Sequence, residues 1–170
     1  MAGMKIGRSL AAACGGGALI WAVIALFFTV RVTTVTGTLA SGAPYATAFI
    51  VRGYQTIGSW VMVLATAAVC LASFDLLREK VSARAALTWG AFAVVLTGAA
   101  WVGGTTPWVA WLPGIPADIQ HAIGTSLVTV TDTPVANTPF WAAAALVVSY
   151  AVILLAIFVL SGNRKSSSPR

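Results

Sequence analysis

Four long apolar stretches alternate with shorter polar segments along this chain, and each stretch is long enough to cross a lipid bilayer. They cover residues 10–30, 57–74, 85–102 and 140–160, and none of them contains an acidic or basic residue. A helix needs about 20 apolar residues to cross the hydrocarbon core. In lipid such a segment must satisfy its backbone hydrogen bonds internally, which favours helix. The pattern therefore predicts four transmembrane helices.

The first stretch, residues 10–30, follows two basic residues, Lys5 and Arg8. A cleaved secretion signal has the same arrangement, with basic residues before an apolar core. Its apolar run exceeds the roughly 7–15 residues that are usual for such a core. We therefore expect this segment to be retained as a membrane-spanning helix, with cleavage as the alternative.

Two longer segments separate the spans on what we expect to be one side of the membrane. Residues 31–56 begin with alternating threonine and valine, which indicates an extended stretch. Residues 45–51 are expected to form an interfacial helix or to extend the second span. Residues 103–139 contain five of the seven prolines. Within them, residues 116–130 predict a short amphipathic helix, because apolar residues recur there at helical spacing.

The fold class that follows is an all-α polytopic membrane protein with four transmembrane helices. We expect a single transmembrane domain over residues 1–162 and a disordered polar tail over residues 163–170. An even number of spans places both termini on the same side of the membrane. The short amphipathic helix would lie outside the cell, between the third and fourth spans.

The basic residues are unevenly distributed, and this predicts the orientation. Basic residues collect on the cytoplasmic side of a membrane. One group lies at the termini and between the second and third spans, and consists of Lys5, Arg8, Arg78, Lys80, Arg84, Arg164, Lys165 and Arg170; the other consists of Arg31 and Arg52. Both termini are therefore expected to be cytoplasmic, in the plasma (inner) membrane of a bacterial cell. This placement accounts for the net charge of +6 without a nucleic-acid partner.

Composition supports a membrane location and limits the chemistry that the chain can perform. Hydrophobic residues make up 59% of the chain and charged residues 8%, whereas a soluble domain carries about 25% charged residues. Cys14 and Cys70 both fall within predicted spans and form no CxxC pair. They are expected to be small packing residues. We expect no cofactor.

The only histidine, His121, follows Asp118 by three residues, so the two would be neighbours on a helix. A zinc site needs three or four ligands, and the sequence offers no second histidine. No acidic residue lies inside a span, where proton-coupled transporters place one. We therefore expect no metal, no catalytic residue and no enzymatic activity. A structural or surface role is expected for the pair, and a pH-responsive or partner contact through His121 is the alternative.

Small residues recur within the spans at positions where helix backbones can approach closely. The candidates for helix packing are Gly15, Gly16, Gly17, Ala68, Ala72, Gly90 and Gly98. Their contacts are expected within the four-helix bundle, with docking against another membrane protein as the alternative.

These observations favour a non-catalytic accessory or structural subunit of a larger bacterial membrane complex. Its partners would be the lipid bilayer and other integral membrane subunits. The candidate contact residues are the outer aromatic side chains and the lone histidine, Tyr45, Tyr54, Trp108, Trp111 and His121.

Two other functions remain open at this stage. A small oligomeric transporter or pore would use the serine and threonine hydroxyls of the spans as a polar path. These are Ser59, Thr66, Ser73, Thr88, Thr97 and Ser149. An envelope-acting protein of a phage or plasmid is the third hypothesis.

Overall fold

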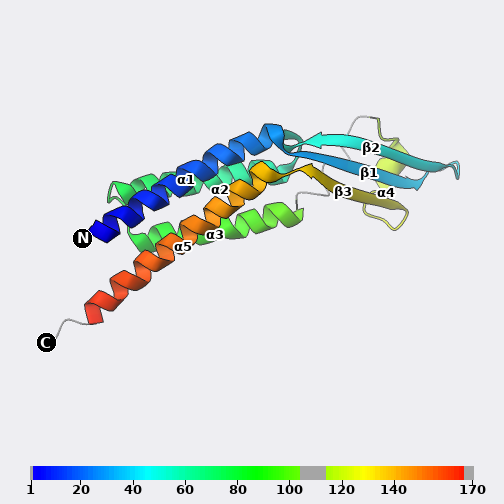
Figure 1. Cartoon of the computed structure of the whole chain (residues 1–170). Helices are drawn as coiled ribbons and strands as arrows, with labels where there is room; N and C mark the ends of the chain where they lie inside the picture. Colours follow the sequence, from blue (N-terminus) through cyan, green and yellow to red (C-terminus); the bar gives the residue numbers. More distant parts are fainter. Residues whose placement is uncertain (1, 104–113, 167–170) are drawn as a thin grey trace.

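The computed structural model describes residues 2–103 and 114–166 of the chain. Four long helices form a bundle, and a small sheet extends from one end of it (Figure 1). The long helices are α1 (Ala2–Phe28), α2 (Ile57–Leu77), α3 (Ala83–Gly103) and α5 (Thr138–Ser166). The remaining elements are β1 (Val30–Thr38), β2 (Pro44–Arg52), the 3-10 turn η1 (Gly53–Gln55), α4 (Ala117–Ala122) and β3 (Val128–Ala136).

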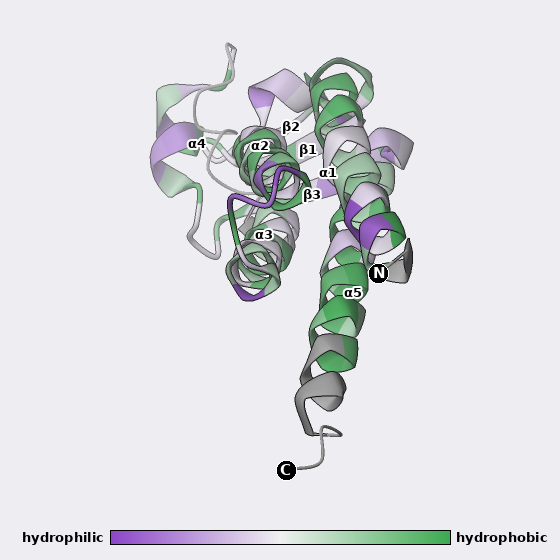
Figure 2. Cartoon of the chain, turned by 90° about the vertical axis from the view of Figure 1, so that its left-hand side faces the viewer, coloured by the Kyte–Doolittle hydropathy of each residue, from purple (hydrophilic) through white to green (hydrophobic). Residues whose placement is uncertain are grey.

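All four long helices are long and apolar enough to cross a membrane. The qualifying segments are Met4–Phe28, Ile57–Leu77, Ala83–Trp101 and Thr138–Leu160. Four helices that could cross a membrane are thus present, as predicted, although the first ends at Phe28 and Val30 already belongs to β1. Seen from the end that carries the termini, the helices are hydrophobic along most of their length, and hydrophilic residues gather near their ends and on α4 (Figure 2).

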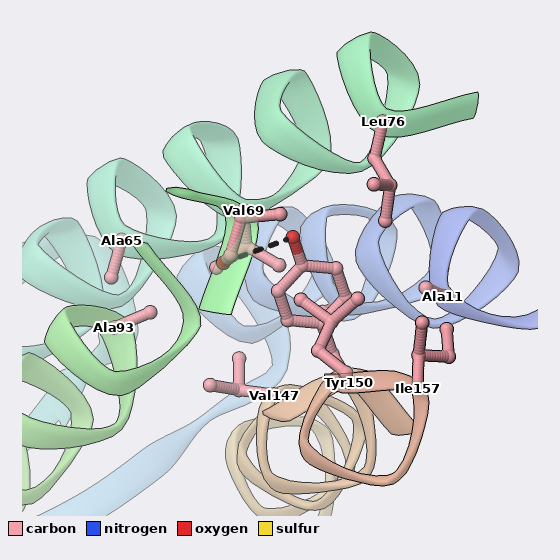
Figure 3. Packing of buried hydrophobic residues seen from close by; sticks show 11 residues of the cluster. Ala11, Ala65, Val69, Leu76, Ala93, Val147, Tyr150 and Ile157 are labelled. Atoms are coloured by element: carbon pink, nitrogen blue, oxygen red, sulfur yellow. Dashed lines mark hydrogen bonds between the residues drawn. The ribbon is translucent and has the colours of Figure 1, made fainter. Parts of the chain in front are cut away.

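The bundle has a ring arrangement in which each helix packs against two neighbours. α1 lies between α2 and α5, and α3 packs against the same two helices from the other side. Its interior consists mainly of small and medium side chains, with Met62, Val69 and Tyr150 among the largest that are fully buried. The Tyr150 hydroxyl lies 3.5 Å from the carbonyl oxygen of Ala86, across the α3–α5 contact (Figure 3).

The expected all-α class has to be corrected, because the segments outside the bundle form a three-stranded antiparallel sheet with the order β2-β1-β3. The alternation of threonine and valine in β1 has the period of two that a strand requires. The third strand comes from the distant loop between α3 and α5. Thr33 pairs with Phe49 on one side and with Asp132 on the other.

The predicted helix at residues 45–51 was wrong, since these residues lie in β2. The turn before β2 makes this possible: the N–H of Leu39 donates to the Ala43 carbonyl, and Gly42 adopts a φ of 83°. Such a three-residue turn with a glycine in the left-handed region directs the chain back as a hairpin. β2 then pairs with β1 along its whole length.

The amphipathic helix predicted at residues 116–130 exists only as α4, Ala117–Ala122. It ends before Gly124, which has a φ of 91°, a conformation that glycine adopts readily and that cannot continue a right-handed helix. Residues 128–136 belong to β3 instead. At the other end of the chain, α5 continues to Ser166, and residues 167–170 of the predicted tail lie outside the described residues.

Candidate interaction site at the sheet end of the bundle

The sheet is joined to three of the four long helices by very short connections. Thr29 alone separates α1 from β1, and Asn137 alone separates β3 from α5. The turn η1 and Thr56 connect β2 to α2. The strands therefore project from the bundle at the end opposite the two termini (Figure 1). Each strand is therefore joined to a long helix by at most a few residues.

A nearly buried ion pair links the central strand, β1, to the edge strand β3. The Arg31 guanidinium donates to Oδ2 of Asp132 over 2.7 Å, and the two side chains are 14% and 8% exposed. The Thr33 hydroxyl donates to the other oxygen, Oδ1 of Asp132, over 3.3 Å. These contacts fix β3 to β1. Removing either charged partner would leave the other charge nearly buried and uncompensated.

A small polar cavity lies beneath the ion pair, where the sheet meets the helices. Its volume is about 10 Å³, which is room for roughly one water molecule. Thr29, Arg31, Ser59 and Asn137 are among its lining residues. The Thr29 hydroxyl is buried there without a hydrogen-bond partner within the described part of the chain. The cavity is too small for an organic ligand.

Helix α4 covers one face of the sheet. Ile119 of α4 and the preceding Ile115 pack against Val35 and Val128, and these four residues form the buried core of this region. Tyr45 and Phe49 pack around the same cluster, with others. This side of the sheet is therefore already occupied by the chain itself.

Asp118 fastens α4 to the β1–β2 turn. Its Oδ2 accepts a hydrogen bond from the Ala40 N–H over 2.8 Å, and its Oδ1 accepts one from the Ile119 N–H over 3.0 Å. The bond from Ala40 is the main reason why the pKa of this carboxyl lies below its usual range. His121 lies exposed in the last turn of α4. Across the described residues, no three His, Cys, Asp or Glu side chains gather as metal ligands would.

The aromatic residues that were predicted to contact partner proteins lie in different environments. Tyr45 is partly buried on the α4 side of the sheet, and its hydroxyl has no hydrogen-bond partner among the described residues. Tyr54 is 46% exposed in η1, and its carbonyl accepts a hydrogen bond from the indole N–H of Trp60 over 2.9 Å. Trp108 and Trp111 lie outside the described residues.

The three glycines of α1 differ in their surroundings. An added Cβ at Gly15 would lie 2.6 Å from Oγ of Ser73 on α2. At Gly17 it would lie 3.3 Å from a methyl group of Leu146 on α5. At Gly16 it would meet no atom within 4 Å. Two of these glycines thus face neighbouring helices, and one does not.

The candidate packing residues of α2 and α3 also differ in burial and in their contact with neighbouring helices. Ala72 is buried and Ala68 is partly buried. An added Cβ at Gly90 would lie 3.0 Å from the ring of Tyr150. At Gly98, an exposed position, it would meet no atom within 4 Å.

Hydroxyl groups within the spans bond mostly to their own helix. The Thr66 hydroxyl donates to the Met62 carbonyl over 2.8 Å, and the Ser73 hydroxyl donates to the Cys70 carbonyl over 2.7 Å. Thr88 and Ser149 bond in the same way on the outside of the bundle. Thr97 instead contacts the sulfur of Met62 at 3.6 Å, and Ser59 accepts from Thr56.

Exposed tryptophans surround the bundle near the sheet. Trp60, Trp101 and Trp141 are each about half exposed, at 49%, 55% and 51%. The ring centroids of Trp101 and Trp141 are 6.2 Å apart. Tryptophan collects at the boundary between lipid and water, and these three side chains lie at the ends of the candidate spans that are nearest the sheet.

The opposite end of the bundle carries basic side chains. Lys5, Arg8 and Arg78 line a surface hollow of about 450 Å³ together with Glu79 and others. Arg8 donates to Glu79 over 2.6 Å, although Glu79 is 71% exposed. An exposed pair of this kind contributes little to stability, typically about 0–1 kcal/mol.

Sequence reasoning missed the Arg31–Asp132 pair, and a signal for it was present. Arg31 is one of two basic residues in the longer segments, and Asp132 is one of two acidic residues there. Opposite charges that are isolated in otherwise uncharged segments are good candidates for pairing. Gly53, the first residue of η1, was also missed. An added Cβ there would collide with the Ala25 carbonyl, so only glycine fits against this turn of α1.

No protein-family model, curated protein or solved structure matches this chain.

Proposed function

We propose that this chain is a non-catalytic accessory subunit of a larger bacterial membrane complex, and that the sheet is its contact with other subunits. The observation that carries the proposal is a sheet that is joined to the bundle by short connections and that, among the described residues, is covered on one face only. α4 packs on one face. The other presents exposed residues from all three strands, which are Thr36, Ala46, Ala48, Ile50, Thr129, Thr131 and Thr133.

The composition of this open face suits contact with protein. It contains small and β-branched side chains, and none of the seven residues is charged. Ile50 is 71% exposed, although it is large and apolar. An exposed surface without charges is typical of interface cores, which are poor in charged residues.

Purification of the intact chain from cells that produce it, in several mild detergents, tests this proposal. We expect one or more integral membrane proteins to be recovered in a fixed molar ratio to the chain. A matched pair of variants locates the contact: Thr131→Arg places a charge on the open face, and Thr88→Arg places one at an exposed position near the other end of the bundle. The first should release the partner and the second should retain it. Recovery of the chain alone in every detergent would contradict the proposal.

We further propose that the termini lie in the cytoplasm and that the sheet lies outside, in the plasma (inner) membrane. The basic residues support this orientation, because the hollow lined by Lys5, Arg8 and Arg78 lies at the end that carries the termini. Single cysteines at Thr131 and at Ser82, in a chain whose Cys14 and Cys70 are replaced by alanine, provide the test. In intact cells an impermeant maleimide should label Thr131→Cys and should leave Ser82→Cys unlabelled. The reverse pattern would invert the orientation.

A further inference from the structure

The hydrogen bonds at both ends of β2 fix the direction in which each of its backbone N–H groups points. The Leu39 N–H donates to Ala43 at the hairpin turn, and the Gly53 N–H donates to Thr29 at the other end. In an antiparallel ladder, alternate residues of a strand point toward the neighbouring strand. With the pairing of Val35 to Thr47, the odd-numbered residues of β2 therefore bond to β1. The even-numbered residues point away from it.

Three even-numbered residues thus present free backbone groups along the outer edge of β2. They are Ala46, Ala48 and Ile50, and no strand lies beyond them within the part of the chain that the structure describes. The fourth, Arg52, already donates its N–H to Oε1 of Gln55 over 2.8 Å. The three remaining positions span about 14 Å at the usual rise of a strand. All three residues are exposed.

Side chains do not protect this edge. From Tyr45 to Val51 the sequence is YATAFIV, which contains no charged residue, proline or glycine. Edge strands that must remain unpaired usually carry lysine, proline or a bulge. β2 has none of these features between its first residue, Pro44, and its last, Arg52.

The other edge of the same sheet provides the contrast. β3 contains Pro134, which has no N–H to donate, and Asp132, whose charge is tied to Arg31. The ladder between β1 and β3 also contains an irregularity, because Val30 pairs with Ala136 and Arg31 pairs with Pro134. That edge is interrupted where β2 is continuous. Among the described residues, the β3 edge is therefore interrupted at its end near the bundle, whereas the β2 edge is continuous from Ala46 to Ile50.

We propose that the outer edge of β2, from Ala46 to Ile50, binds an extended segment of a partner protein as a fourth strand of the sheet. This inference rests on the proposed accessory function and names the element that makes the contact. Only another extended backbone matches three donor and acceptor pairs at this spacing. The added strand places side chains beside Ala46, Ala48 and Ile50 on the open face, so it carries uncharged, small or β-branched residues there.

A second copy of this chain does not fit this edge. The strands run along the bundle axis (Figure 1), so two copies in one membrane that are related by a two-fold axis along the membrane normal would have parallel β2 strands. The same residues of the two copies would then lie at the same level. A parallel ladder instead requires the facing groups to be staggered by one residue. This excludes two-fold pairing of the β2 edges of two copies, and we assign the edge to a segment of a different protein.

The decisive variant removes one backbone N–H from the outer edge of β2. Ala48→Pro deletes the outward N–H, while the bonds between β2 and β1 remain, since proline is tolerated at the open side of edge strands. Ala48→Thr is the matched control, because it changes the same exposed side chain and keeps the N–H. In purifications of the intact chain, we expect Ala48→Pro to lower partner recovery by about tenfold or more, which corresponds to the loss of roughly one net hydrogen bond. Ala48→Thr should retain the partner.

Hydrogen exchange of the unaltered chain gives a second measurement that does not depend on the folding of a variant. The amides of Ala46, Ala48 and Ile50 should exchange at least about tenfold more slowly in the purified complex than in the chain stripped of its partner. The amides of Thr129 and Thr131, which face β1, should change little. Equal exchange at the β2 edge in both samples, or slow exchange already in the stripped chain, would overturn the inference.

The remaining outcomes separate this inference from the proposed function. If both Ala48 variants retain the partner, the accessory role stands and the strand addition is wrong. If both lose it, the contact runs through side chains of the open face and the edge is not the site. If the unaltered chain recovers no partner, the proposed function fails and the inference fails with it.

Discussion

The helical bundle and the sheet differ in which property of a side chain decides whether it is buried. In the bundle, interior and exterior are equally apolar: Val69 is fully buried, while Leu64, on the same helix, is 70% exposed. The positions that face other helices differ from the outer ones mainly in size, as Gly15, Ala65 and Ala72 show. In the sheet, polarity distinguishes buried from exposed positions: Val35 is buried, and the next residue, Thr36, is exposed.

This difference follows from the surroundings of each region. Lipid is as apolar as a leucine side chain, so burial in the bundle gains little from hydrophobicity and depends on close packing. The sheet projects from the end of the bundle, where burial of Ile119 and Val35 removes apolar surface from water. Substitutions that change polarity should therefore affect mainly the sheet, and substitutions that change size should affect mainly the bundle.

The largest effect is expected at the ion pair that holds β3 to β1. Asp132→Ala leaves the Arg31 guanidinium nearly buried and without its charge partner, which costs about 3–5 kcal/mol. The sheet should become sensitive to limited proteolysis while the helices remain resistant. The double variant Arg31→Met with Asp132→Leu removes both charges and should restore most of the protection. Equal sensitivity of the single and double variants would show that the charges do not matter.

Loss of the α4 contact should be the next largest effect. Ile119→Ala empties a fully buried position against Val35, which costs about 2–4 kcal/mol for an isoleucine in a core. In this variant, the backbone amides of α4 and of the β1–β2 turn should exchange faster with solvent than in the unaltered chain. Leu127→Ala is the control: this residue is 69% exposed, so its truncation should change stability by less than about 0.5 kcal/mol.

A change of size alone should destabilise the bundle. Gly15→Ala brings a methyl group to 2.6 Å from Oγ of Ser73 and 3.2 Å from the Val69 carbonyl, and such overpacking costs about 1–3 kcal/mol. Gly16→Ala is the matched control at the adjacent position, where the same methyl group meets no atom within 4 Å. Thermal unfolding in detergent should show a lower midpoint for the first variant only. A lower midpoint for both would mean that helix packing does not distinguish these glycines.

The smallest effect concerns pH. The folded-state pKa of Asp118 is lowered, mainly by the hydrogen bond from Ala40. A group with a lowered folded pKa contributes stability above its unfolded pKa, near about 4, and this contribution is lost as pH falls toward the folded value. Docking of α4 on the turn should therefore weaken below about pH 4 and should not change between pH 6 and 8. Asp118→Asn should remove this acid dependence, as measured by exchange of the Ala40 amide. An unchanged acid response in the variant would assign it to another group.

The apolar runs were sufficient to predict the bundle, whereas the sheet was predicted only in part. Each span is defined by its own composition, so no information from elsewhere in the chain is needed. The extended stretch that begins near Arg31 was indicated by its alternation, and it is β1. β2 was expected to be helical, because YATAFIV has no polar alternation that would reveal a strand.

The candidate site could be predicted less well than the fold. Tyr45 and Tyr54 were selected as aromatic residues outside the spans, but their surroundings depend on pairing that a local pattern does not contain. Arg31 and Asp132 are 101 positions apart in the chain. Neither an ion pair across that separation nor a free edge on β2 can be inferred before the strand order is known.

The amino-acid sequence by itself determined which segments are long and apolar enough to cross a membrane. Long uncharged runs are stable in hydrocarbon whatever their neighbours are, because the cost of leaving water is a property of each side chain. Only the tertiary structure decided that two separate loops share one sheet, that α4 covers one of its faces, and that no strand pairs with the outer edge of β2 in the described part of the chain. Strand pairing satisfies backbone groups, which every residue carries alike, so side-chain identity alone does not reveal the partner of each strand.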